Sequence, residues 1–76
     1  MANSEIKYEV LNKIGILSTS EKGWTTELRL IKWNDRDAKY DIRPWSSDGT
    51  RMGKGITLTK DEAMRLRDLL NALQLN

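Results

Sequence analysis

The feature of this sequence that most restricts its fold is a capped amphipathic helix near the C-terminal end. Thr59-Lys60-Asp61-Glu62 fits a capping box, in which Thr59 caps the first turn and Glu62 reaches back to it. Apolar residues then recur at helical spacing as far as Leu73, which predicts a helix over about residues 60–74. At roughly 1.5 Å per residue, this helix is long enough to lie across one face of a small sheet.

The segments before this helix alternate between apolar and polar residues, as strands do, and polar turn sequences separate them. The first segment alternates imperfectly, which predicts an irregularity near Gly15. Pro44 has no N–H for a ladder, so the third strand should lie at a sheet edge or end there. This order predicts a single α+β domain over residues 1–76, with one sheet face covered by the helix. The strands are expected over about residues 8–18, 24–34, 39–46 and 52–58.

The sequence contains neither Cys nor His, and this absence limits its chemistry. Without Cys there is no disulfide, thiolate nucleophile or zinc–thiolate site, and without His the usual general base is lost. We therefore expect no enzyme, cofactor, metal or small-molecule substrate. Asp35, Asp37 and Asp48 lie in turn-like sequence, where local hydrogen bonding is more common than a paired-carboxylate site that includes Asp41.

No apolar run approaches the roughly 20 residues of a membrane span, and the polar segment Met1–Glu9 lacks the apolar core of an export signal. We expect a cytoplasmic protein, associated with the nucleoid if it binds DNA.

Positive charge and all three tryptophans are concentrated in the middle of the chain. Residues 22–60 hold nine Lys and Arg against five acids, whereas the two ends together are acidic. Basic residues interleaved with Trp24, Trp33 and Trp45 favour an anionic partner that also offers flat faces. The two glycines around Lys54 either let the backbone approach a phosphate or form a plain turn, and the tripeptide alone favours the turn.

Period-two counting assigns the strand residues to two faces. Leu28 and Leu30 select the inward face of the second strand, so its other face should be open to solvent. Exposed tryptophans beside Arg and Lys would form a platform on which bases stack while the cations hold phosphates. The alternative is that the tryptophans belong to the core. The open face is expected to hold Arg29, Trp33, Lys39, Arg43 and Trp45.

The apolar stripe of the helix has two interpretations. It either covers the core of a monomer or pairs two copies of the chain, from which a short chain gains most. Pattern alone leaves the two open. The residues concerned are Leu66, Leu69, Leu70 and Leu73.

Three segments in a fixed order resemble a known family. The segment from Lys39 ends in Ile-Arg-Pro-Trp, the segment from Met52 contains Gly-Lys-Gly-Ile-Thr-Leu, and a capped acidic helix start follows. Over about residues 8–73 this arrangement resembles the positive-cofactor-four family of transcriptional coactivators. Gly23-Trp24 and Trp33-Asn34 are most similar to its small bacterial branch, the YdbC-like proteins. The resemblance implies a four-stranded curved antiparallel sheet, dimerisation through the helices, and binding of single-stranded DNA with little sequence preference.

Carried over by position, the resemblance assigns Trp33, Arg43, Trp45, Lys54 and either Arg36 or Lys39, which are nearly the residues that face counting places on the open face. Basic residues contact phosphates without selecting a sequence, and aromatic residues stack on bases. The same surface could instead bind RNA, and a Trp-rich face could instead meet a protein. The expected nucleic-acid-binding residues are Trp24, Arg29, Trp33, Arg36, Lys39, Arg43, Trp45 and Lys54.

Overall fold

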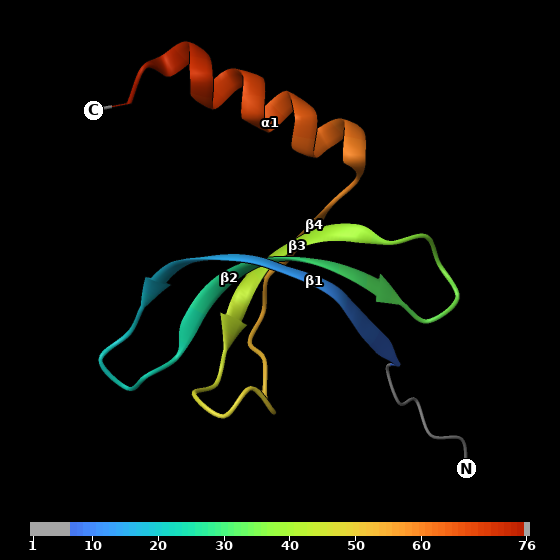
Figure 1. The fold of residues 1–76 in the computed structure, drawn as a ribbon, viewed down its shortest axis with the longest axis vertical. Coiled ribbons are helices and arrows are strands. Elements are labelled where there is room, and N and C mark those ends of the chain that lie inside the picture. The colour runs from blue at the N-terminus through green and yellow to red at the C-terminus, as the bar shows by residue number, and fades with distance from the viewer. Residues whose placement is uncertain (1–6, 76) are drawn as a thin grey trace.

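The computed structural model of the chain describes residues 7–75 and forms one antiparallel sheet followed by a helix (Figure 1). The strands pair in sequence order, so every neighbour in the chain is also a neighbour in the sheet. This confirms the predicted α+β class. Residues 1–6, with most of the segment used to predict the absence of an export signal, lie outside the described range. The elements are β1 (Tyr8–Thr19), β2 (Thr25–Trp33), β3 (Lys39–Trp45), β4 (Ile56–Leu58) and α1 (Lys60–Leu73).

Strand β1 carries a regular series of bulges, which explains its imperfect alternation. Its pairing with β2 shifts register three times, each time skipping one residue of β1. The irregularity predicted near Gly15 is thus confirmed, and two further shifts accompany it. Because a bulge bends its strand and increases its twist, β1 forms an arch across the sheet (Figure 1). The skipped residues are Leu11, Ile14 and Leu17, all apolar.

Strand β4 is much shorter than predicted, because the chain before it passes close to the backbone of β3. A Cβ atom at Gly55 would lie 2.2 Å from the carbonyl oxygen of Ile42, and one at Gly53 would lie 2.7 Å from Cγ of Pro44. The predicted strand is therefore wrong over residues 53–55, and Met52 forms only an isolated bridge with Trp45. Both glycines have a structural role, since the close approach leaves no room for a side chain.

Pro44 lies in an interior strand, so the edge position proposed for it is wrong. Its carbonyl accepts a hydrogen bond from the Gly53 N–H at 2.9 Å, which shows that its backbone polar groups point toward the β4 side. The β3–β4 ladder ends at Ile42, so no ladder bond is lost at Pro44. The strand ends one residue later, at Trp45, close to the predicted end.

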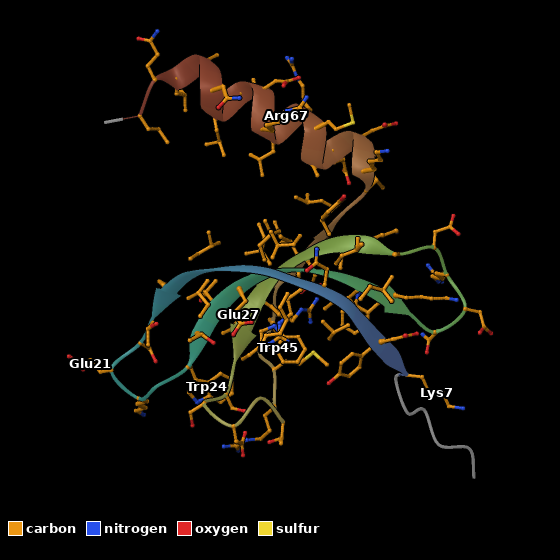
Figure 2. The ribbon with its side chains drawn as sticks, viewed as in Figure 1. Lys7, Glu21, Trp24, Glu27, Trp45 and Arg67 are labelled. Atoms are coloured by element: carbon orange, nitrogen blue, oxygen red, sulfur yellow. The ribbon has the colours of Figure 1, made fainter. Side chains whose placement is uncertain are left out.

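The two sides of the sheet differ in what covers them. The helix face, on the side of α1, carries Leu28, Tyr40, Ile42 and Leu58, which border a cleft shared with α1. The open face lies on the other side, where Figure 2 places Trp24 and Trp45. Its residues on β2 and β3 are Thr25, Glu27, Arg29, Ile31, Trp33, Lys39, Asp41, Arg43 and Trp45.

The most buried apolar side chains lie on the open face, which reverses the expected distribution. Ile31 is 0% exposed and Trp45 is 1% exposed, whereas Leu28 and Leu30, the predicted inward residues, are only half-buried. The difference arises from the elements that cover each face of the sheet. The arch of β1 brings Tyr8 against Trp45, with ring centroids 6.0 Å apart, while the helix stays away from the opposite face.

Helix α1 begins with the predicted capping box. Thr59 Oγ1 accepts a hydrogen bond from the Glu62 N–H at 3.1 Å, and Glu62 Oε1 accepts one from the Thr59 N–H at 2.8 Å. The helix ends at Leu73, and Gln74 adopts a left-handed conformation. None of its residues is buried. Figure 1 shows why: α1 leads away from the end of β4 and stands apart from the sheet.

Candidate nucleic-acid interface

Four charged side chains form an alternating square on the open face. Glu27 and Arg29 follow each other on one side of β2, and Asp41 and Arg43 do the same on β3. The antiparallel register sets Glu27 opposite Arg43 and Arg29 opposite Asp41. Opposite charges therefore alternate in both directions, which favours this pairing of the two strands. The square as a whole carries no net charge, so it cannot by itself supply the positive field that attracts a polyanion.

The first ion pair of the square is buried. Arg29 Nη2 lies 2.7 Å from Glu27 Oε1, and both side chains are less than a tenth exposed. A hydrogen bond from the Thr25 hydroxyl also reaches Glu27. Burial raises the pKa of Glu27, but the hydrogen bond from Thr25 and the Arg29 guanidinium outweigh it, so the pKa lies below its ordinary value of 4.5. Glu27 therefore stays ionised beneath the sheet surface.

Arg29 covers Trp45, and this corrects the exposure predicted for both residues. The guanidinium carbon lies 3.8 Å from the centroid of the Trp45 ring, in a cation–π contact. Face counting placed both residues correctly on the open face, but their expected exposure is wrong. At 1% exposure, Trp45 offers no free ring surface to a base, and Arg29 is 6% exposed. Both belong to the core under this face.

The second ion pair, between Asp41 and Arg43, has the same arrangement as the first, with its Arg beside Trp33. Arg43 donates through Nε and Nη2 to the two carboxylate oxygens of Asp41, at 2.6 and 2.7 Å. Its guanidinium carbon lies 4.8 Å from the centroid of the Trp33 ring. Tyr8 lies beside the same indole, with ring centroids 5.4 Å apart. Unlike Trp45, Trp33 is only half-buried, so part of its ring remains accessible.

An open pocket lies at this end of the sheet. It has a volume of about 390 Å³ and brings together four of the eight predicted binding residues: Trp33, Arg36, Lys39 and Arg43. The β2–β3 turn supplies Asn34 and Asp37, and β4 supplies Thr57. Arg36 is exposed and Lys39 is half-buried, so two cations remain beside the aromatic wall in addition to the paired Arg43. A flat ring and a phosphate can be accommodated together here.

A second aromatic–basic pair lies at the opposite end of β2. The guanidinium carbon of Arg51 is 5.8 Å from the centroid of the Trp24 ring, and Trp24 is half-buried. Sequence reasoning included Trp24 but missed Arg51, because the turn that positions Arg51 is set by side-chain hydrogen bonds. Asp48 Oδ1 accepts bonds from the Thr50 N–H at 3.0 Å and from the Ser46 hydroxyl at 2.7 Å.

These hydrogen bonds, with that of Thr50 first, lower the pKa of Asp48 to about 2. The turn role predicted for Asp48 is confirmed, whereas Asp41 takes neither of the predicted roles and pairs with Arg43. Lys54, the remaining predicted cation, is exposed next to Gly53, whose carbonyl lies 3.5 Å from Arg43 Nη1.

The helix face carries a different surface. A cleft of about 530 Å³ separates the sheet from α1, and its lining is mostly apolar. Ile14 and Leu17 of β1 border it on one side, and Leu66 and Leu70 of α1 on the other. All four predicted dimer residues are exposed in the single chain: Leu66 at 38%, Leu69 at 48%, Leu70 at 43% and Leu73 at 65%.

Within residues 7–75, no helix is both long and apolar enough to cross a membrane. The fold and the open face together describe a small sheet protein with aromatic and basic side chains on one surface. The chain belongs to the family described as Transcriptional Coactivator p15 (PC4), whose model matches residues 20–69, and this confirms the family indicated by the sequence resemblance. That family is known for nucleic-acid binding and coactivator roles. The chain is also 53% identical to an uncharacterized protein of Treponema pallidum (strain Nichols), over 100% of this chain and 89% of that protein.

Proposed function

We propose that this chain binds single-stranded DNA with little sequence preference, as a homodimer, through the open face of its sheet. The observation that supports this most directly is the pocket in which half-buried Trp33 lies beside Arg36, Lys39 and Arg43. Stacking on an indole tolerates every base, and phosphate contacts carry no sequence information. Duplex DNA keeps its bases stacked inside the helix and cannot use the indole in this way.

The proposed surface extends from the Trp33 pocket toward Trp24. Arg51 and Lys54 supply further exposed cations on the way, beyond those of the pocket. We assign stacking to Trp33 and Trp24 and phosphate contacts to Arg36, Lys39, Lys54 and Arg51. Trp45 and Arg29 support this surface from below. No catalytic step is proposed.

Homodimerisation is part of the proposal because the helix face is incomplete in one chain. Leucines of α1 and the skipped apolar residues of β1 are exposed on the same side of the sheet. A second copy would bury both sets at once. Two open faces would then lie in one assembly, and one nucleic-acid strand could contact both. In a cell we place the dimer in the cytoplasm, on nucleoid DNA, in transcription regulation, replication or repair.

The test is a titration of tryptophan fluorescence with oligo-dT, a mixed-sequence strand and a duplex of equal length. We expect similar quenching and affinity with both single strands, and much weaker binding to the duplex. The logarithm of the association constant should fall linearly with the logarithm of salt concentration, by about 0.7 for each phosphate neutralised. Equal or stronger binding of the duplex would overturn the proposal. A matched RNA strand in competition decides between DNA and RNA, and strong salt dependence of oligo-dT binding counts against the alternative of a protein-interaction surface.

A further inference from the structure

Asp41 is an unusual residue to find beneath a surface that attracts an anion. Its carboxylate is 0% exposed, and it contacts Arg43, which lines the Trp33 pocket. Coulomb's law alone makes this carboxylate unfavourable for binding of a phosphate nearby. A buried charge is also costly to desolvate, and pairing only partly compensates that cost.

The carboxylate fixes the orientation of the Arg43 guanidinium. Both oxygens are engaged, by Nε at 2.6 Å and by Nη2 at 2.7 Å, which is the two-point geometry that only Arg can make with a carboxylate. The third nitrogen, Nη1, points toward the Gly53 carbonyl at 3.5 Å. The Arg43 side chain is only 15% exposed. Arg43 is thus held from one side by β3 itself and from another by the segment that precedes β4.

Arg43 in turn holds the indole of Trp33. The guanidinium carbon lies 4.8 Å from the ring centroid, and both side chains line the same pocket. The chain of contacts runs from a fully buried carboxylate through a fixed cation to the ring that faces the pocket. We infer that Asp41 is a positioning residue for nucleic-acid binding: through Arg43 it holds Trp33 ready to stack. This inference rests on the proposed function.

Whether Asp41→Asn raises or lowers the affinity for oligo-dT distinguishes a positioning role from a purely electrostatic one. Asp41→Asn keeps the shape of the side chain and removes its negative charge. If Asp41 acted only as a nearby charge, the variant would bind oligo-dT more tightly, because a repulsion is lost. If Asp41 positions Trp33, the variant binds more weakly although its surface has become more positive. The fluorescence quenching at saturation should also shrink, since fewer bases stack on the indole.

The same sheet provides a matched control. Glu27 makes the equivalent ion pair with Arg29, and Arg29 lies over Trp45 as Arg43 lies over Trp33. Trp45, however, is 1% exposed and has no free ring for a ligand. Glu27→Gln, like Asp41→Asn, replaces a carboxylate by an amide. It does so beside Arg29 and Trp45, outside the Trp33 pocket. It should lower stability without lowering the affinity of the folded protein.

The experiment compares wild type, Asp41→Asn and Glu27→Gln in oligo-dT titrations, with affinities corrected for the folded fraction measured by urea unfolding. We expect Asp41→Asn to bind about three- to tenfold more weakly, with reduced quenching, and Glu27→Gln to stay within about twofold of wild type. Asp41→Asn that binds as tightly as wild type, or more tightly, overturns the inference. Equal weakening by Glu27→Gln also overturns it, because the effect would then be a general one of the sheet. If folded wild type does not bind oligo-dT, the proposed function itself fails.

A second variant decides the matter if Asp41→Asn does not fold. Arg43→Lys keeps the positive charge but loses the two-point contact with Asp41. The slope of affinity against salt should stay unchanged, since the number of cations is the same, while affinity and quenching fall. Wild-type affinity in Arg43→Lys overturns the inference.

Discussion

The guanidinium of Arg29 lies across the ring of Trp45 at 3.8 Å and closes that indole off from solvent. The contact determines how Trp45→Ala should behave. Removing a buried Trp side chain leaves a cavity and costs about 3–5 kcal/mol of unfolding free energy. The affinity of the folded fraction for oligo-dT should stay near that of wild type, because Trp45 presents no ring surface to a base.

Trp33→Ala is the control, and it should lower the affinity for oligo-dT more than the stability. We expect a loss of about 1–3 kcal/mol in binding, as for other stacked aromatics, with a smaller change in stability. Urea unfolding and oligo-dT titration on each variant measure both effects, and Trp45→Phe replaces Trp45→Ala if the latter is unfolded. A folded Trp45 variant that loses as much affinity as Trp33→Ala would return Trp45 to the binding surface.

The lowered pKa of Glu27 predicts that the protein loses part of its folding stability in acid. Its pKa in the folded chain lies below 4.5, so its ion pair contributes stability that is fully present above about pH 4.5 and is lost as the pH falls through the lower folded value. Glu27→Gln should remove this part of the pH dependence. At pH 7 the variant should be less stable than wild type by about 1–3 kcal/mol, because Arg29 loses a charged acceptor.

The measurement is the urea midpoint from pH 7 to pH 3 for both proteins. The two curves should converge as the pH falls, since wild type alone loses the Glu27 contribution. Lys13 also acts on Glu27, so Lys13→Ala should shift the wild-type curve in the same direction by a smaller amount. Parallel curves for wild type and Glu27→Gln would mean that this carboxylate does not titrate in the range.

Gly55 should be the glycine least tolerant of a side chain. Besides the Ile42 carbonyl oxygen, its added Cβ would lie 2.3 Å from Cβ of Arg43, so the backbones themselves would have to separate. Gly55→Ala should therefore destabilise the fold by about 1–3 kcal/mol or more. Gly15→Ala is the control, because a Cβ there meets nothing within 4 Å. Thermal unfolding of the two variants compares them directly, and equal melting temperatures would contradict the close approach.

Local sequence signals predicted the features of this fold that depend on local chemistry. The capping box at Thr59 and Glu62 and the face of each residue on β2 and β3 follow from neighbours in the chain, and these were predictable. Which elements cover each face of the sheet could not be predicted in this way. Period-two counting says that Trp45 and Arg43 share a face, but the burial of Trp45 depends on Arg29 and Tyr8, which other strands bring over it.

The two register shifts of β1 that were not predicted and the error in the length of β4 have a related cause. In β1 a residue is skipped at every third position, so its apolar residues follow a period of three that a test for alternation detects only as irregularity. Just before β4, the Gly-Lys-Gly segment has a strand-like sequence around it, yet its path is set by the packing of Gly53 against Pro44. Both features arise from contacts between strands, which one-dimensional periodicity does not contain.

Lys39 should contribute one phosphate contact. It lines the Trp33 pocket and no ion pair engages it among the described residues. Lys39→Ala should weaken binding to oligo-dT and to a mixed-sequence strand alike, and should flatten the salt dependence by about 0.7. Lys32→Ala is the control, since Lys32 is exposed outside this pocket and should leave the slope unchanged. A changed sequence preference with an unchanged slope would exclude a phosphate contact by Lys39.

The last prediction concerns the helix face and tests the dimer. Because α1 has no buried residue in the single chain, its apolar stripe gains protection from water only by association. Wild type should sediment as a dimer, and its melting temperature should rise with protein concentration. Leu70→Asp puts a carboxylate into the cleft lining and should give a monomer of lower stability.

Arg65→Asp introduces the same side chain on α1 but outside the cleft lining, so it should remain dimeric. Analytical ultracentrifugation and thermal unfolding over a hundredfold range of concentration, about 1–100 μM, compare the three proteins. The dimer is excluded if wild type sediments as a monomer with a melting temperature independent of concentration. Leu70→Asp should also lower the affinity for long oligo-dT more than for short strands, because only a dimer presents two open faces to one strand.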